Sequence, residues 1–316
     1  MQPPETASAS GMLCVRAIAD MRAIVRSWRD AGRTIGLVPT MGALHDGHLS
    51  LVDASRSRAH QTVVSIFVNP MQFGPNEDFD KYPREEGRDL AALERRGGCD
   101  VVFIPPVSEL FRDGRCTLAD FVTKVSVDAL GERLCGLHRP GHFTAVATQV
   151  MKLLMIALPD VAIFGEKDYQ QLRVIKRMVG DLNVPVTIES APTVRERDGV
   201  AMSSRNAYLS PELRAKAPLL FETLRSTAED LRQGGVVSDA LQRAATTLLT
   251  GGFRSVDYFS LVGAEDLHTL DRLDRPARLL AAASLGPARL IDNVPVEPIA
   301  QRGLTFAVAR DETKSG

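Results

Sequence analysis

Length, composition and charge limit what this chain can be. It has 316 residues, 44% hydrophobic and 24% charged, which is typical of a globular protein large enough for two domains. The net charge of −1 argues against a protein that binds nucleic acid through its overall charge. Four scattered cysteines without a CxxC pair indicate a reducing compartment, and we expect the cytoplasm. No apolar run reaches the ~20 residues of a membrane helix, and residues 1–11 are expected to form a flexible tail.

Strand-like and helix-like segments alternate over the first 192 residues. Apolar and β-branched runs predict strands at 34–38, 62–68, 100–104, 161–164 and 184–188. Apolar residues at helical spacing predict helices at 48–58, 85–96, 143–158 and 169–179. The alternation predicts a parallel sheet flanked by helices, a Rossmann-like α/β domain over residues 12–192. In such folds ligands bind beyond the carboxyl ends of the strands.

The pattern changes after residue 192. Residues 193–210 are polar and rich in turn-forming residues, and residues 211–250 are typical of Ala-, Leu- and Arg-rich helices with a break at Gly234 and Gly235. Short strand-like runs follow within 253–262 and 278–291. We therefore expect a smaller C-terminal α+β domain over residues 193–316.

The most informative turn follows the first predicted strand. His45, Asp46, Gly47 and His48 lie where that strand ends and a helix begins. A helix N-terminus has free N–H groups and a partial positive charge that attract phosphate, and glycine lets the backbone approach a ligand. Histidines can donate hydrogen bonds to phosphate oxygens, more strongly when charged. The turn therefore predicts nucleotide binding for attack at the α-phosphate.

Two simpler roles for these histidines stay open at this point. Histidines at this spacing can cap a helix, or they can bind a metal ion. A zinc site would need further ligands at suitable spacing, and the cysteines do not supply them.

Further motifs follow the histidine turn in a fixed order. They occupy residues 39–52, 67–74, 82–84, 139–143, 164–172, 202–206 and 289–293. In this combination the chain, from about residue 34 to 295, resembles the pantothenate synthetase (pantoate–β-alanine ligase) family of the HxGH nucleotidylyltransferase superfamily.

The resemblance implies an ATP-dependent ligase. In that family the pantoate carboxylate attacks the α-phosphate to give pantoyl adenylate and pyrophosphate, and the amine of β-alanine then displaces AMP. An ionised carboxylate needs alignment and charge stabilisation rather than a general base. By resemblance, the catalytic groups are His45, His48, Lys167, Ser203, Ser204 and Arg205. The residues implied to bind ATP are Pro39, Met41, Gly47, His48, Gly165, Lys167, Asp168, Val194, Met202, Ser203, Ser204 and Arg205.

The pantoate site is also implied by the resemblance. Neutral amides suit the two hydroxyls of pantoate, because an amide both donates and accepts hydrogen bonds without adding charge. The implied contacts are Met41, Asn69, Gln72, Gln171 and Tyr82. His142 is expected to begin a helix near this site or to be a buried structural histidine.

The expected cofactor is Mg²⁺ with ATP, and no organic prosthetic group is expected. The resemblance implies that Asp89 holds the magnesium, directly or through a water molecule, although Arg88 stands where some relatives have a second carboxylate. The expected partners are ATP, pantoate, β-alanine and a second copy in a homodimer, with no nucleic acid and no membrane. Two departures from the family stand near the site: Ala145 where glycine is frequent, and Cys135 where some relatives have glutamate.

Three rival functions share parts of this pattern. A nucleotidyltransferase that keeps the nucleotide in its product would share the histidine turn, but it would not need Gln72 and Gln171. A non-catalytic nucleotide sensor is disfavoured because His45, His48, Lys167 and Arg205 are all intact. A tRNA-linked synthetase is disfavoured by the near-zero net charge.

Overall fold

The computed structural model describes residues 11–75, 77–111 and 117–298. Nearly all of the predicted tail at 1–11 lies outside these residues, as does the end of the predicted second domain beyond residue 298. Within the described residues no helix is long and apolar enough to cross a membrane.

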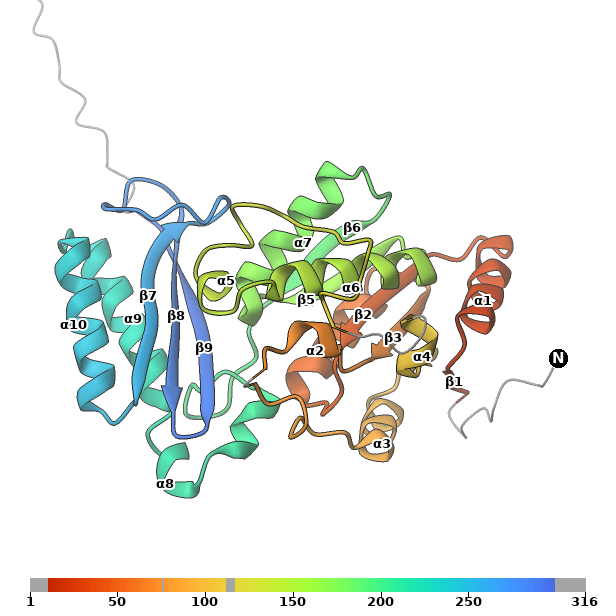
Figure 1. The fold of residues 1–316 in the computed structure, drawn as a ribbon, viewed down its shortest axis with the longest axis horizontal. Helices are drawn as coiled ribbons and strands as arrows, with labels where there is room; N and C mark the ends of the chain where they lie inside the picture. Colours follow the sequence, from red (N-terminus) through yellow and green to blue (C-terminus); the bar gives the residue numbers. More distant parts are fainter. Residues whose placement is uncertain (1–10, 76, 112–116, 299–316) are drawn as a thin grey trace, which may run out of the picture.

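The larger part of the molecule is a six-stranded parallel sheet, ordered β1-β4-β3-β2-β5-β6 (Figure 1). Its strands are β1 (Leu13–Val15), β2 (Ile35–Thr40), β3 (Gln61–Ile66), β4 (Val101–Phe103), β5 (Val161–Gly165) and β6 (Thr187–Ala191). The helices of this part are α1 (Ile18–Asp30), α2 (Asp46–Arg56), α3 (Glu86–Arg96), α4 (Val107–Leu110), α5 (Cys135–His138), α6 (His142–Ala157) and α7 (Tyr169–Asp181). Two 3₁₀ turns, η1 (Pro70–Gln72) and η3 (Glu166–Asp168), follow β3 and β5.

The order of the strands determines where a ligand-binding crevice lies. From β2 the chain moves outward through β3 and β4, and it later returns to add β5 on the other side of β2. The order of the sheet therefore reverses between β2 and β5. In open α/β sheets this switch point leaves a crevice beyond the carboxyl ends of the strands, where ligands bind. The histidine turn follows β2 and the Lys167 turn follows β5, so the two motifs meet at this crevice.

The parallel sheet is buried on both faces, which explains its continuous apolar runs. Successive residues of β2 belong to different cores, since Leu37 packs with α1, α6 and α7, whereas Val38 packs with residues of α2 and α3. This alternation follows from the two-residue period of a strand. The sheet is thus a rigid layer that fixes the loops at its carboxyl edge.

The smaller part is an antiparallel sheet of β7 (Ser255–Gly263), β8 (Ala277–Leu285) and β9 (Ala288–Val296). Helices α9 (Pro218–Arg232) and α10 (Val237–Thr250) pack on this sheet, on the side away from the parallel sheet (Figure 1). The short helix α8 (Pro211–Arg214) and the 3₁₀ turn η4 (Ser204–Tyr208) connect the two parts. The predicted α/β fold with a smaller α+β part is confirmed, and the predicted boundary after residue 192 falls just after β6.

Two N-terminal elements were missed by the sequence prediction. β1 has three residues and is held at the sheet edge by pairing with β4. α1 buries only Met21 and Val25 completely, so its apolar stripe is narrow. The strand predicted at 184–188 lies three residues further along, where β6 pairs with β5 through Thr187 and Ile188.

A close approach of α2 to β2 gives a stability prediction. A Cβ added to Gly36 would lie 2.1 Å from Ser55 Oγ but 3.3 Å from Ser55 Cβ. Gly36→Ala should therefore lower the free energy of unfolding by about 1–3 kcal/mol, the usual penalty for overpacking. Adding Ser55→Ala removes the clashing hydroxyl, so the double variant should be more stable than the sum of the two single effects predicts. Urea denaturation of the four proteins measures this coupling, and strictly additive effects would refute the close packing.

Candidate active site

A cavity of about 200 Å³ lies at the crevice between β2 and β5. Every residue that the sequence analysis assigned to catalysis, ATP or pantoate lines it, and only Asp89, the proposed metal ligand, does not. The lining residues from those assignments are Pro39, Met41, His45, Gly47, His48, Asn69, Gln72, Tyr82, Gly165, Lys167, Asp168, Gln171, Val194, Met202, Ser203, Ser204 and Arg205. The structure therefore brings together segments up to 166 residues apart in sequence, from Pro39 to Arg205.

The two histidines cap the helix that carries them. His45 is the N-cap of α2, and its Nδ1 accepts a hydrogen bond from the Gly47 N–H (3.2 Å). His48 Nδ1 accepts from the His45 N–H at 3.4 Å, which completes a reciprocal capping box. The cap that the sequence left open as an alternative is thus present. It does not exclude ligand binding, because each ring has a second nitrogen.

These caps determine the protonation of the rings. A nitrogen that accepts an N–H carries no proton, so the neutral ring is protonated at Nε2. Burial, followed by the Lys167 charge, lowers the pKa of His45 to about 4. Burial, followed by the charges of His45 and Lys167, lowers the pKa of His48 to about 3. At neutral pH the pair supplies two uncharged Nε2–H donors beside the cavity, with ring centroids 4.1 Å apart.

Gly47 is required between them. A Cβ at this position would lie 2.8 Å from His45 Cε1 and 2.9 Å from its Nδ1. Any larger residue would displace the ring that caps the helix.

Residues of the smaller sheet hold the backbone of the turn that carries Lys167. The side-chain amide of Asn293, on β9, donates to the carbonyls of Glu166 (2.9 Å) and Lys167 (3.0 Å). Arg278, on β8, binds Asn293 Oδ1 and the Glu166 carboxylate, each at 2.7 Å. The motif at 289–293 was noted in the sequence without a role, and the structure shows that Asn293 fixes the backbone of the Lys167 turn.

The segment at 202–205 is tied to the loop before α3. Arg205 makes a bidentate ion pair with Asp78, at 2.9 Å from Nε and 3.0 Å from Nη2. Ser204 Oγ lies 3.0 Å from Tyr82 Oη, and Ser203 Oγ accepts from the Arg205 N–H. Arg205 and Ser204 therefore have protein partners in this structure, and their contacts with phosphate stay a prediction.

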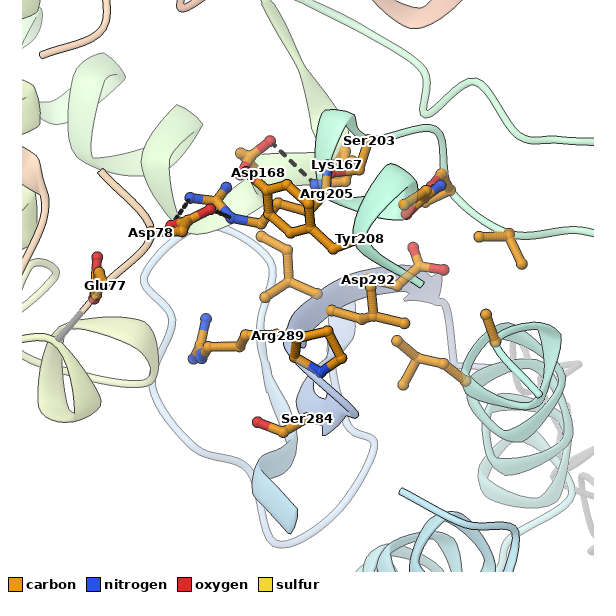
Figure 2. Close-up of a pocket in the computed structure, with 18 of the residues that line it drawn as sticks. Glu77, Asp78, Lys167, Asp168, Ser203, Arg205, Tyr208, Ser284, Arg289 and Asp292 are labelled. Carbon is orange, nitrogen blue, oxygen red and sulfur yellow. Dashed lines mark hydrogen bonds and ion pairs between the residues drawn. The ribbon is translucent and has the colours of Figure 1, made fainter. Parts of the chain in front are cut away.

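A larger cavity, of about 660 Å³, lies between the two parts of the molecule (Figure 2). It shares Lys167, Asp168, Ser203 and Arg205 with the smaller cavity. Figure 2 shows the Asp78–Arg205 and Lys167–Asp168 pairs at this shared border, with Arg289 on the opposite side. Two cations and two carboxylates, joined in ion pairs, therefore lie where the two cavities share their lining.

The smaller cavity is also lined by side-chain amides. Asn69 is buried, and its Nδ2 donates to Gln72 Oε1 and to the Ala145 carbonyl, both at 3.3 Å. Gln72 Nε2 in turn contacts Met41 Sδ (2.6 Å). Asn69 also caps η1 by accepting from the Met71 N–H. Asn69 thus positions Gln72, whereas Gln171 lines the cavity from α7.

His142 supports the backbone of Gln72 through a hydrogen bond. Arg139 donates from Nη1 to His142 Nε2 (3.0 Å), so His142 is protonated at Nδ1, which donates to the Gln72 carbonyl (2.9 Å). Burial, followed by the Arg139 charge, lowers the pKa of His142 to about 3. Arg139 is itself paired with Glu77. His142 therefore begins α6, as expected, and it is a partly buried histidine that binds the backbone of Gln72.

Asp89 lies under the histidine turn. Its carboxylate is 2% exposed and accepts from the N–H groups of Ala43 (2.9 Å) and Leu44 (2.7 Å). Gly42 and Ala43 have positive φ, and a Cβ on Gly42 would lie 2.9 Å from Asp89 Oδ2. Among the described residues no group of three His, Cys, Asp or Glu side chains is arranged to hold a metal. This geometry does not fit a direct magnesium ligand, and it gives Asp89 the role of holding the turn.

Comparison with known proteins identifies the family. The family model described as pantoate-beta-alanine ligase matches residues 13–295. The chain belongs to this family. It is 55% identical over 284 residues to the pantothenate synthetase of Paramagnetospirillum magneticum, covering 90% of this chain and 98% of that protein.

Solved structures of the family have the same fold. The pantothenate synthetase of Thermus thermophilus matches with a TM-score of 0.83 and 44% identity, over 90% of this chain and 99% of the other. The pantoate–β-alanine ligase of Francisella tularensis, described as complexed with β-γ ATP and β-alanine, matches with a TM-score of 0.74 and 32% identity, over 90% and 97%.

The two departures from the family lie outside the cavity lining. The Cys135 thiol is buried beside Tyr258 Oη (3.0 Å) and the Arg289 guanidinium (3.5 Å). Ala145 is fully buried and offers its carbonyl to Asn69. Neither side chain lines the smaller cavity.

The protonation of the buried histidines can be measured directly. Nitrogen chemical shifts of histidine-labelled protein at pH 6 should show His45 and His48 protonated at Nε2 and His142 at Nδ1. None of the three should titrate above pH 5, since their pKa values lie well below 6.5. Because the unfolded rings take up protons below about pH 6.5 and the folded rings do not, their neutral forms should make folding less favourable as pH falls from 6.5 toward 4. A ring that titrates near 6.5 in the folded protein would contradict its burial.

Proposed function

We propose that this protein joins pantoate to β-alanine in two steps, with ATP as the energy source. The observation that carries the proposal is a single cavity lined by two kinds of polar group. His45 and His48 with their Nε2–H donors line it together with Lys167, and so do the amides of Gln72 and Gln171. Phosphate fits the first kind of group and a hydroxylated carboxylic acid fits the second.

In the first step, an oxygen of the pantoate carboxylate forms a bond to the α-phosphorus of ATP. The bond between the α-phosphorus and the bridging oxygen breaks, and pyrophosphate leaves. His45, His48 and Lys167 stabilise negative charge that develops on the phosphate oxygens, and the donors of the two histidines are fixed before the substrate binds. In the second step, the β-alanine nitrogen bonds to the acyl carbon, AMP leaves and the amine loses a proton.

We further propose that ATP binds as its magnesium complex, that the protein acts in the cytoplasm and that it forms a homodimer. The magnesium proposal follows from the phosphate chemistry of ATP, since Mg²⁺ usually keeps few protein ligands at such sites. No step above is assigned to the metal.

One assay tests the function. Purified protein with ATP, Mg²⁺, pantoate and β-alanine should release free AMP and pyrophosphate in equal amounts. Without β-alanine it should release one pyrophosphate per active site and then stop, since the acyl adenylate stays bound. A product that keeps the nucleotide would instead support a nucleotidyltransferase. Pyrophosphate release that strictly requires β-alanine would refute the two-step order.

The capping and donating roles of His48 can be separated. Asparagine places an acceptor close to the position of Nδ1, so His48→Asn should keep the cap, whereas it lacks the Nε2–H. Adenylation in His48→Asn and His48→Ala should fall by roughly 10²–10³, the scale for losing one transition-state donor. The adenylation rate of Lys167→Ala should fall by a similar factor. The rate of Lys216→Ala should stay at the wild-type value, because Lys216 is an exposed lysine outside both cavities. Near-normal adenylation by a folded His48→Asn would assign His48 to the cap alone.

The role of Asp89 predicts a distinct behaviour. Asp89→Asn replaces one acceptor oxygen by an amide that cannot accept from the turn, so kcat should fall and the turn should loosen. The Mg²⁺ concentration that gives half-maximal activity should stay within about twofold of wild type. A rise of tenfold or more would show that Asp89 is a magnesium ligand after all.

We propose that residues 193–316 act as a lid over the nucleotide. ATP offers Arg205 a phosphate partner in place of Asp78, and closure would keep water from the adenylate. Amide hydrogen exchange across residues 195–210 should slow when ATP saturates the protein, while exchange in α10, which lines neither cavity, stays unchanged. Equal exchange with and without ATP would contradict a moving lid.

A further inference from the structure

Gln149 carries a buried amide that has no hydrogen-bond partner. It lies on α6, and its side chain is among the buried polar groups at 5% exposure. Within the described residues neither its Oε1 nor its Nε2 has a partner. A buried amide without partners destabilises a folded protein, and most such groups in proteins are paired. This amide therefore needs an explanation.

A second buried glutamine shows the normal situation. Gln170, on α7, is 4% exposed, and both the nitrogen and the oxygen of its amide are hydrogen-bonded. Its Nε2 donates to the carbonyls of Leu130 (2.9 Å) and Arg133 (2.6 Å), and its Oε1 accepts from the Cys135 N–H (3.0 Å). Two glutamines of equal burial thus differ completely in their bonding. The fold itself satisfies Gln170, so Gln170 needs no ligand.

The position of Gln149 indicates what kind of group supplies the missing hydrogen-bond partner of its amide. Helix α6 lines the smaller cavity with Val146, Gln149, Val150 and Leu153, which share one face because they are spaced three or four residues apart. Gln149 is the one polar side chain of this face. The carbonyl of Ala145, one turn earlier on α6, accepts a hydrogen bond from Asn69, which also lines the cavity.

We propose that Gln149 is a specificity-determining residue whose amide hydrogen-bonds a hydroxyl of pantoate. This rests on the proposed function, and it adds a residue to which that function assigned no role. The apolar side chains beside Gln149 suit the dimethyl centre of pantoate, and the neutral amide suits a hydroxyl next to that centre. The apolar residues tolerate a substrate that lacks the hydroxyl, whereas Gln149 discriminates against it because the amide is then left unpaired.

The test compares Gln149→Met with Gln170→Met. Methionine has nearly the volume of glutamine and no amide. Pantoate-dependent exchange of labelled pyrophosphate into ATP is measured with pantoate, with 2-hydroxy-3,3-dimethylbutanoate and with 4-hydroxy-3,3-dimethylbutanoate. In Gln149→Met the preference of kcat/KM for pantoate over one of the two analogues should shrink about tenfold, mainly through a higher KM for pantoate. In Gln170→Met both preferences should stay at the wild-type values.

Thermal unfolding of the ligand-free proteins gives a second measurement. Gln149→Met should melt at or above the wild-type temperature, because it removes an unpaired amide, whereas Gln170→Met should melt lower, because it removes three hydrogen bonds. Wild-type preferences for both analogues in a folded Gln149→Met would overturn the role of Gln149 alone. Wild-type protein that exchanges no pyrophosphate in the presence of pantoate would overturn the proposed function, and with it the ligand assigned to Gln149.

Discussion

The hydrogen bonds at the start of α2 are the constraint on which the rest of the site depends. Each histidine accepts a backbone N–H through Nδ1, so the same contact ends the strand-to-helix turn and fixes the tautomer. A cap and a ligand-binding group are often treated as alternatives. In a histidine they are compatible, because the imidazole has an acceptor on one side and a donor on the other. The result is a pair of neutral donors whose direction the backbone sets before a ligand arrives, which is what electrostatic stabilisation of a phosphate requires.

The opposite side of the site depends on contacts between the two parts of the molecule. Asn293 holds the carbonyls of the Lys167 turn, and Arg278 holds both Asn293 and Glu166. The neighbouring Asp292 binds Arg195, which begins the hairpin that leads to residues 202–205. The last strand of the smaller sheet therefore positions two separate segments that line the smaller cavity, and a change in β9 should affect both of them.

The sequence was sufficient for the central strands of the parallel sheet, and the resemblance named most of the polar residues that line the cavity, whereas β1 and the α6 face of the cavity were missed. The long apolar runs of β2, β3 and β5 could be predicted because strands covered on both faces have little else in them. What the sequence could not show is which polar groups satisfy one another. Asp89 was assigned to magnesium by resemblance to the family, and only the fold shows two backbone amides bound to it. Gln149 and Gln170 are the same residue in similar helical contexts, and their difference lies entirely in atoms from distant segments.

The Asp78–Arg205 pair shows how the site can be both stable and able to open. The two side chains are about a quarter exposed, so the pair is neither fully screened by water nor deeply buried. A bidentate guanidinium–carboxylate contact and a bidentate guanidinium–phosphate contact have similar geometry. Arg205 can therefore exchange one for the other without passing through a buried, unpaired charge, which would be strongly unfavourable. Asp78 then keeps access to solvent, because it lines the larger cavity and not the smaller one. In the proposed lid, this exchange would make the position of residues 202–205 depend on the ligand, whereas His45, His48 and the Lys167 backbone are held by contacts within the protein.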